Sequence, residues 1–251
     1  MVTGWQRIGV SSGIAAWSAA ALPLAVRALA ASGEPLRCGG TWAVGLDLLP
    51  NDAAGRVGGV DFPWGDVGLV PEPLHKAQLS AIYPGYPQPS PDETASAFAF
   101  RLNRDAAHLD GLLPVGADRQ RMVKEPHAWI LGLPLNECDA GAAPLVIWQG
   151  SHLILREAFC NALSAHPPRD WDAIDMTEVY GAARRDVFRL CQRIEVPAKP
   201  GEATLLHRLT LHGVAPWAEG SKAPAEGRII AYFRPKLSSI EDWIEYWPEG
   251  H

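Results

Sequence analysis

Glycine and proline interrupt this chain so often that few of its segments can form a long helix. The 251 residues include 24 Gly and 22 Pro, and no repeat period orders them, so a collagen-like chain is excluded. Most apolar stretches between these breaks are short and rich in β-branched or aromatic residues, which is typical of strands. With 47% hydrophobic residues, the chain has enough apolar material for a substantial core. The pattern predicts many short strands joined by turns and long loops.

Seven segments have the composition of strands. One of them alternates in polarity, because Phe98, Phe100 and Leu102 lie on one side and smaller or charged residues on the other, as a half-buried strand requires. A short helix is expected over residues 74–82, before a Pro-rich turn. The predicted strands span residues 39–49, 96–102, 127–133, 144–148, 193–196, 203–207 and 228–233.

Besides residues 74–82, two longer regions have helical spacing. Residues 8–26 carry no charge, but Ser, Trp and Pro dilute the apolar run and Arg27 follows it. We therefore expect a packed helix, capped near Ser11 or Ser12, rather than a signal peptide or a membrane span. The second region, about residues 152–190, is expected to be a helical insert between strands.

The order of these elements restricts the fold class. It lacks both a βαβ alternation and a Gly-rich phosphate loop, so a doubly wound nucleotide-binding fold is disfavoured. We expect one domain over residues 1–251, mainly β with flanking helices, as an antiparallel sandwich or jelly roll. Its core is expected at about 95–236, preceded by an N-terminal helical and strand region over 1–94.

Charge and cysteine content exclude several classes of protein. A net charge of −6 and a pI near 5.7 argue against a nucleic-acid partner, which usually meets a basic surplus. The four cysteines contain no C-x-x-C pair, so a zinc ribbon or a thioredoxin-type site is not expected. We interpret them as ordinary thiols in a cytoplasmic protein without a membrane segment. These cysteines are Cys38, Cys138, Cys160 and Cys191.

Three settings contain residues that could perform chemistry. His108 and Asp110 are two positions apart, so on a strand both would face the same side and could chelate one ion. His212 lies in an apolar segment just before a glycine, where an imidazole is held rigidly. Two imidazoles and one carboxylate leave three positions open on an octahedral ion, as non-haem Fe(II) oxygenases require. Arg228, at the start of the last strand, could bind a carboxylate with its guanidinium fork.

Each of these residues also has a simpler interpretation. An H-x-D pair occurs often by chance on a surface or in a core, and an arginine at a strand end is often solvated. His207 competes with His212 as the distal histidine. His127 is interpreted as a structural residue, and the basic run of Arg119, Arg121 and Lys124 as a solvated loop face, although it could also meet an anionic substrate. Trp129 and Trp148 could line a pocket.

The motifs, read together, resemble a known family. They are H-x-D at 108–110, A-P-L-V-I-W-Q-G-S-H at 143–152, P-G-x-A-x-x-x-H-x-x-x-x-H-G at 200–213, and R-x-x-x-Y at 228–232. Over about residues 95–236 this pattern is similar to the phytanoyl-CoA dioxygenase-like branch of the Fe(II)- and 2-oxoglutarate-dependent oxygenases.

The resemblance implies a double-stranded β-helix, also called a jelly roll or cupin-like fold, with Fe(II) and 2-oxoglutarate at one open end. It implies that His108, Asp110 and His212 bind the iron and that Arg228 binds the distal carboxylate of 2-oxoglutarate. It further implies a dioxygenase that uses dioxygen to hydroxylate a small molecule, releasing succinate and CO2. In the family the Gly150-Ser151-His152 element tends to be structural.

Two departures from the family pattern leave alternatives open. The insert lengthens the gap between Asp110 and His212, and the loop at 219–222 lengthens the gap from His212 to Arg228. Arg234 therefore remains a second candidate for the cosubstrate. A metal-binding cupin-like isomerase or binding module would need no such arginine, and a catalytically silent scaffold would keep only the fold.

Overall fold

Three antiparallel sheets and several helices make up the described part of the chain. The computed structural model describes residues 2–91 and 93–245. The largest sheet has the strand order β1-β9-β6-β11-β3-β2, a second sheet has the order β10-β7-β8, and β4 pairs with β5. The strands of the largest sheet are β1 (Trp5–Ile8), β2 (Trp42–Asp47), β3 (Gln78–Ile82), β6 (Trp129–Pro134), β9 (Ala203–His207) and β11 (Arg228–Phe233). The remaining strands are β4 (Leu112–Val115), β5 (Gln120–Val123), β7 (Leu145–Gln149), β8 (Gln192–Val196) and β10 (His212–Val214).

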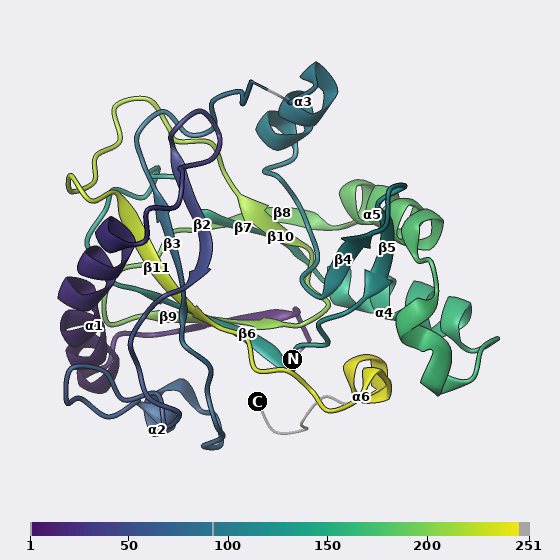
Figure 1. The fold of residues 1–251 in the computed structure, drawn as a ribbon, viewed down its shortest axis with the longest axis horizontal. Helices are drawn as coiled ribbons and strands as arrows, with labels where there is room; N and C mark the ends of the chain where they lie inside the picture. The colour runs from purple at the N-terminus through teal and green to yellow at the C-terminus, as the bar shows by residue number, and fades with distance from the viewer. Residues whose placement is uncertain (1, 92, 246–251) are drawn as a thin grey trace.

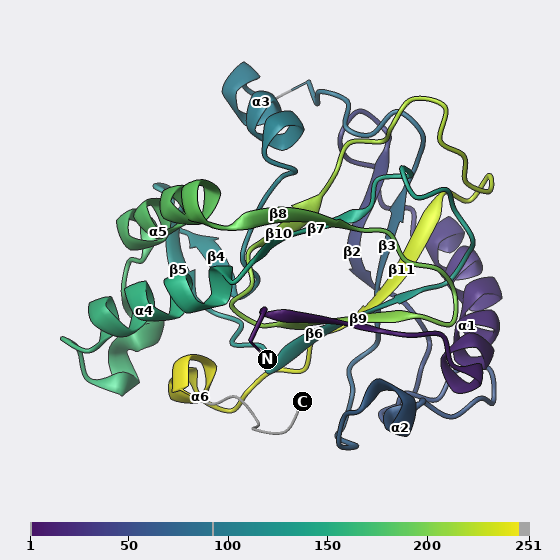
Figure 2. The ribbon, with the colours of Figure 1, turned by 180° about the vertical axis from the view of Figure 1, so that it is seen from behind.

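The large sheet and the β10-β7-β8 sheet form two facing layers (Figure 2). Side chains from both layers meet in a buried cluster between them. The cluster contains Ile130 and Leu206 from the large sheet, and Ile147 and Val196 from the smaller one. This arrangement agrees with the predicted mainly β fold with antiparallel strands, and it leaves an interior between the layers in which inward-facing residues can meet.

Helix α1 (Ser12–Ala31) covers the outer face of the large sheet (Figure 1). It begins as predicted, because the Ser11 hydroxyl accepts a hydrogen bond from the Ile14 backbone N–H at 3.0 Å and caps the helix. Ile14 and Trp17 are fully buried in the same core as residues of β3, β6, β9 and β11. By length and composition α1 is apolar enough to cross a membrane, but in this fold it packs on the sheet.

The helical insert is present and forms a second core. Helix α4 (Ser151–Leu163), a 3-10 helix (Pro168–Ala173) and α5 (Thr177–Leu190) lie between β7 and β8. Their apolar faces pack together with β4, β5 and the C-terminal helix α6 (Ile240–Glu245). This body lies to one side of the two facing sheets (Figure 1).

Two local predictions are wrong. Residues 74–82 contain no helix but the strand β3, which pairs with β11 and β2 on its two sides. Residues 96–102 are not a strand but lie in helix α3 (Ala95–Asn103), capped by the Thr94 hydroxyl on the Ala97 N–H at 3.2 Å. The alternation of polarity predicted a strand with one buried face, but α3 buries none of its residues. The alternation in this segment therefore does not arise from packing in a sheet.

The loop between β2 and β3 contains one more short helix, α2 (Trp64–Val67). All four cysteines are free, and Cys38 is fully buried while the other three are partly exposed.

Candidate metal centre

His212 lies close to His108 and Asp110 although it belongs to a distant stretch of the chain. The segment after α3 pairs with the start of β10, where His108 N–H donates to His212 O at 2.8 Å and His212 N–H donates to His108 O at 3.1 Å. Gly213 permits this approach, since a Cβ there would clash with the carbonyl oxygen of Asp105. One donor atom from each of the three side chains lies within 4.8 Å of the others.

Both imidazoles are oriented by the backbone. His108 Nδ1–H donates to Ala106 O at 3.0 Å, and His212 Nδ1–H donates to Thr210 O at 2.9 Å. Because a carbonyl oxygen can only accept, the proton of each neutral ring is on Nδ1 and the lone pair is on Nε2. The Nε2 atoms lie 3.5 Å and 3.9 Å from the two carboxylate oxygens of Asp110. The three donors therefore face one point.

The protonation states suit a cation. Burial raises the pKa of Asp110, but His212, Arg234 and His108 outweigh burial and hold this pKa well below its usual range. Burial, followed by the charge of His108, lowers the pKa of His212 to about 4. At neutral pH the site thus offers a carboxylate and a neutral His212, which are the forms that ligate a metal ion.

Arg234 is a further member of this site. Its Nη1 donates to Asp110 Oδ2 at 2.8 Å, and both side chains are mostly buried. The backbone of Arg234 is held from two sides, because its N–H donates to His75 Nε2 at 2.8 Å and its carbonyl accepts from His127 Nδ1 at 3.0 Å. The guanidinium therefore fixes the orientation of the Asp110 carboxylate.

Removal of the Arg234 guanidinium should destabilise the metal-free protein. Arg234→Met leaves Asp110 as a buried charge without its hydrogen-bonded cation, which costs about 3–5 kcal/mol of unfolding free energy. Denaturant unfolding of the single variants and of the double variant with Asp110→Asn measures this coupling. We expect the double variant to recover part of the loss. Additive losses would contradict the ion pair.

Two cavities adjoin inside the sandwich. The first, of about 270 Å³, contains the three metal-ligand candidates and Arg234. The second, of about 160 Å³, contains Arg228. Four residues line both cavities, so the two spaces share walls. These residues are Ile130, Leu145, Leu206 and Tyr232.

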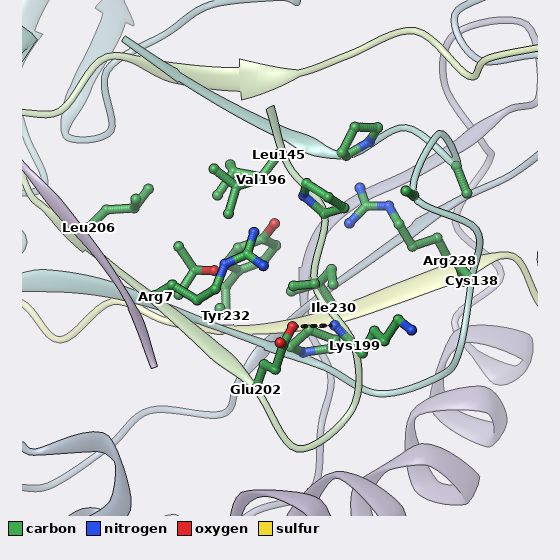
Figure 3. A pocket seen from close by; sticks show the side chains of 18 of the residues that line it. Arg7, Cys138, Leu145, Val196, Lys199, Glu202, Leu206, Arg228, Ile230 and Tyr232 are labelled. Atoms are coloured by element: carbon green, nitrogen blue, oxygen red, sulfur yellow. Dashed lines mark hydrogen bonds between the residues drawn. The ribbon is translucent and has the colours of Figure 1, made fainter. Parts of the chain in front are cut away.

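Arg228 reaches into the second cavity from one side, opposite Arg7 (Figure 3). It is 8% exposed, and its Nε and Nη2 have no hydrogen-bond partner within the described residues. These two N–H groups form one edge of the guanidinium, which is the geometry that binds a carboxylate with two parallel hydrogen bonds. Arg234, in contrast, already has a carboxylate on its Nη1.

The face of β11 explains why these residues meet. Alternation along a strand places Arg228, Ile230 and Tyr232 on one side, and Arg234 continues the series just past its end. Tyr232 was not singled out from the sequence as a cavity residue, although this spacing of two was available as a signal. The pairing of Arg234 with Asp110 gave no local signal.

Other sequence candidates lie elsewhere. His207 is buried beside His152, with ring centroids 4.9 Å apart, and is not part of the metal cluster. His127 is buried and bonded to the backbone, as its structural interpretation predicted. Trp129 and Trp148 line neither of the two cavities, because they pack in the two hydrophobic cores.

Acid should destabilise the metal-free protein through three buried histidines. Burial is the first cause that lowers the pKa of His127 to about 4, of His207 to about 2 and of His212 to about 4. Unfolded histidine titrates near 6.5, so below that pH the unfolded chain binds more protons than the folded one. Each group then removes about 1.4 kcal/mol of stability per pH unit until its folded pKa is reached. Burial raises the pKa of the Glu72 carboxyl, so protonation of this one group in acid favours the folded state and offsets part of the loss.

Denaturant unfolding at pH 7 and pH 5 measures this effect. We expect a lower unfolding free energy at pH 5 and a shallower pH dependence in His127→Gln. A stability independent of pH over this interval would contradict buried neutral imidazoles.

Comparison with known proteins gives structural neighbours only. No family model matches the chain, and no curated protein matches it. The solved structures that it resembles include SnoK, a non-heme alpha ketoglutarate-dependent carbocyclase from nogalamycin biosynthesis, with 14% identity and a TM-score of 0.42 over 96% of this chain and 85% of that chain. The epimerase SnoN, in complex with Fe3+, alpha ketoglutarate and nogalamycin RO, has 14% identity and a TM-score of 0.45 over 100% of this chain and 88% of that one.

EctD from S. alaskensis, with 2-oxoglutarate and 5-hydroxyectoine, has 13% identity and a TM-score of 0.38 over 93% of this chain and 73% of that chain. These neighbours are 2-oxoglutarate enzymes or complexes. Their TM-scores are all below 0.5.

Proposed function

We propose that this chain is a non-haem Fe(II)- and 2-oxoglutarate-dependent dioxygenase that hydroxylates a small organic molecule. The observation that carries the proposal is the convergence of His108, Asp110 and His212 next to a cavity lined by Arg228, whose Nε and Nη2 have no hydrogen-bond partner within the described residues. A metal-binding module without a cosubstrate would need the first feature but not the second.

The donor set suits Fe(II). Two imidazole Nε2 atoms and one carboxylate oxygen would hold the ion, and this is the donor set of the non-haem Fe(II) oxygenases. Hydrogen bonds to the three candidate ligands support this assignment. The backbone carbonyls of Ala106 and Thr210 orient the two imidazole rings, and Arg234 orients the Asp110 carboxylate. With Asp110 retained, the set favours hydroxylation over a variant in which a halide replaces the carboxylate.

The cosubstrate is proposed to lie across the two adjoining cavities. A 2-oxoglutarate molecule has two carboxylates, one beside the keto group and one at the far end. Arg228 is proposed to bind the far carboxylate through Nε and Nη2, while the keto end faces His108, Asp110 and His212. The free edge of Arg228 supports this assignment over Arg234, whose Nη1 is bonded to Asp110.

The strand order supports a double-stranded β-helix. A jelly roll consists of two facing antiparallel sheets, and the chain passes from one sheet to the other. Here β10 carries His212 in the smaller sheet, and β11 carries Arg228 in the larger sheet. The H-x-D segment extends the smaller sheet through its bridge to His212.

The protein's own contribution is binding, orientation and exclusion of water. Bound iron and 2-oxoglutarate supply the oxidative chemistry, in which dioxygen is consumed, succinate and CO2 are released and a substrate C–H bond becomes C–OH. Asp110 remains a carboxylate at neutral pH because of its cationic neighbours. The buried side chains Ile130 and Leu206 line both cavities and keep the cosubstrate away from bulk water.

An anaerobic titration tests the proposal. Addition of 2-oxoglutarate to the Fe(II)-loaded chain is expected to produce a metal-to-ligand charge-transfer band. Admission of air, with ascorbate present as the two-electron reductant in place of the unidentified substrate, should convert 2-oxoglutarate to succinate and CO2. Retained Fe(II) binding without this band would favour a cupin-like metal protein. Absence of Fe(II) binding would favour a silent scaffold.

A further inference from the structure

Besides the two cavities described above, a groove borders the metal centre. The H-x-D segment at 108–110 lies between this groove and the metal cavity. The groove lies between α3, the β4-β5 hairpin and α5, and its volume is about 400 Å³. Its apolar part includes Phe100, Leu109 and Leu112, of which both leucines are almost fully buried. Its polar part consists mainly of four arginines. We call this feature the arginine groove, with the lining arginines Arg101, Arg119, Arg121 and Arg184.

The arginine groove holds an uncompensated positive charge. Arg101 is paired with Glu93 at 2.6 Å. Within residues 2–91 and 93–245, no carboxylate lies within ion-pair distance of Arg119, Arg121 or Arg184, and no Asp or Glu lines the groove. The whole chain has a net charge of −6, so this local surplus of cations stands against the overall charge and favours an anionic ligand.

Aromatic rings fix the position of one of these cations. The Arg184 guanidinium carbon lies 4.8 Å from the ring centroid of Phe100 and 5.2 Å from that of Tyr180. Cation–π contact holds the guanidinium over the ring faces, and no carboxylate of the described residues forms an ion pair with Arg184. Arg184 is therefore pre-positioned for an anion without a carboxylate to hold it.

His108 connects this groove to the metal centre. It lines both the arginine groove and the metal cavity, and its side chain is 47% exposed. A molecule that lies across His108 can therefore place one end among the arginines and another part in the metal cavity. The segment 108–110 forms the wall between the two spaces. Leu109 faces the groove, whereas its neighbours His108 and Asp110 face the metal site.

We propose that the arginine groove binds an anionic group of the substrate, a carboxylate or a phosphate monoester carried on an apolar or aromatic body. The arginines bind the charge, Phe100 and the leucines contact the apolar body, and the reacting carbon lies beyond His108. The assignment of this ligand as the substrate rests on the proposed function, whereas the anion site itself does not.

Phenyl phosphate and benzoate serve as the two probes, with benzyl alcohol as the neutral control. Ligand-observed NMR on the full chain loaded with Mn(II) and 2-oxoglutarate measures both binding and closeness to the metal, because Mn(II) broadens the signals of a nearby ligand. We expect at least one anion to bind and to be broadened, and benzyl alcohol to bind more weakly. The stronger of the two anions identifies the substrate as a phosphate ester or a carboxylate.

Arginine variants decide whether the groove is the binding site. Arg121→Gln and Arg184→Gln are each expected to weaken anion binding about tenfold or more, since a hydrogen bond to a charged group contributes roughly 1.5–3 kcal/mol. Arg185→Gln, on the same helix but exposed and outside the groove, should bind as the wild type does. Thermal unfolding identifies any variant that does not fold. If Arg184→Gln does not fold, Arg184→Lys replaces it. Because Arg184→Lys keeps the charge, a smaller loss of anion affinity is expected.

Two results would overturn the proposal. Equal binding of both anions by Arg121→Gln and the wild type would exclude the groove as the anion site. Arginine-dependent binding without any Mn(II) broadening, in a chain that binds Mn(II), would leave an anion site but remove its link to the reaction. A chain that binds the anions through these arginines but does not bind Mn(II) would instead contradict the metal centre, so the two failures are distinguishable.

Discussion

Asp110→Ala is expected to abolish metal binding and 2-oxoglutarate turnover together. Asp110 supplies the only carboxylate among the three converging donors, and loss of an outer partner of a ligand already costs roughly 10–100-fold in affinity. Removal of the ligand itself should therefore weaken Fe(II) or Mn(II) binding by at least about 100-fold. Equilibrium titration with Mn(II), followed by electron paramagnetic resonance, measures the affinity, and succinate formation measures the turnover.

Asp118→Ala is the matched control for this change. Asp118 is exposed in the turn between β4 and β5, close in sequence to the site but outside the metal cluster. It should keep the wild-type metal affinity. Wild-type metal affinity or 2-oxoglutarate turnover in Asp110→Ala would mean that the ligand assignment is wrong.

Arg228→Gln should raise the requirement for 2-oxoglutarate by roughly 100-fold or more while metal affinity stays the same. The change removes two charge-assisted hydrogen bonds, each worth about 1.5–3 kcal/mol, and tenfold in affinity corresponds to about 1.4 kcal/mol. Arg228→Lys keeps the charge but lacks the two-pronged edge, so it should recover only part of the affinity. The dependence of the charge-transfer band on 2-oxoglutarate concentration measures the effect.

Arg234→Gln distinguishes the two candidate arginines. If Arg228 binds the cosubstrate, Arg234→Gln should affect mainly the orientation of Asp110 and the stability of the metal-free protein. An unchanged 2-oxoglutarate requirement in Arg228→Gln, together with a strongly raised one in Arg234→Gln, would transfer the role to Arg234.

The strands of the interior were largely predictable because their pattern and their surroundings agree. β9 and β11 are rich in β-branched or aliphatic residues, and both lie in the centre of the large sheet, where burial on both faces favours such residues. The spacing of His108 and Asp110 likewise predicted a shared face. The cap at Ser11 followed from local chemistry alone.

The errors occur where tertiary contacts decide. Residues Gln78–Ile82 have no strong intrinsic preference for a strand. They form β3 because they pair with β11 and β2. The segment Ala95–Asn103 alternates in polarity but lies outside the sheets, where a capped, alanine-rich helix forms. The β4-β5 hairpin, which bears Arg119 and Arg121, contains a proline and charged residues and gave no strand signal.

Long-range charge pairing could not be predicted either. Asp110 and Arg234 are 124 positions apart, and no local pattern links them. The arginine groove is likewise formed by residues that are far apart in the sequence. Its arginines Arg101, Arg121 and Arg184 belong to α3, β5 and α5, respectively. Of these three, the sequence indicates only Arg121, as part of the basic run Arg119, Arg121 and Lys124. A solvated loop face is the simpler interpretation of that run, and contact with an anionic substrate is the alternative.

The most direct test of the metal centre is a crystal structure of the chain with Mn(II) and 2-oxoglutarate. Anomalous diffraction is expected to place one ion between His108 Nε2, His212 Nε2 and an oxygen of Asp110, with a carboxylate of 2-oxoglutarate on Arg228. An ion bound elsewhere, or an imidazole of His212 turned away from Asp110, would contradict the account.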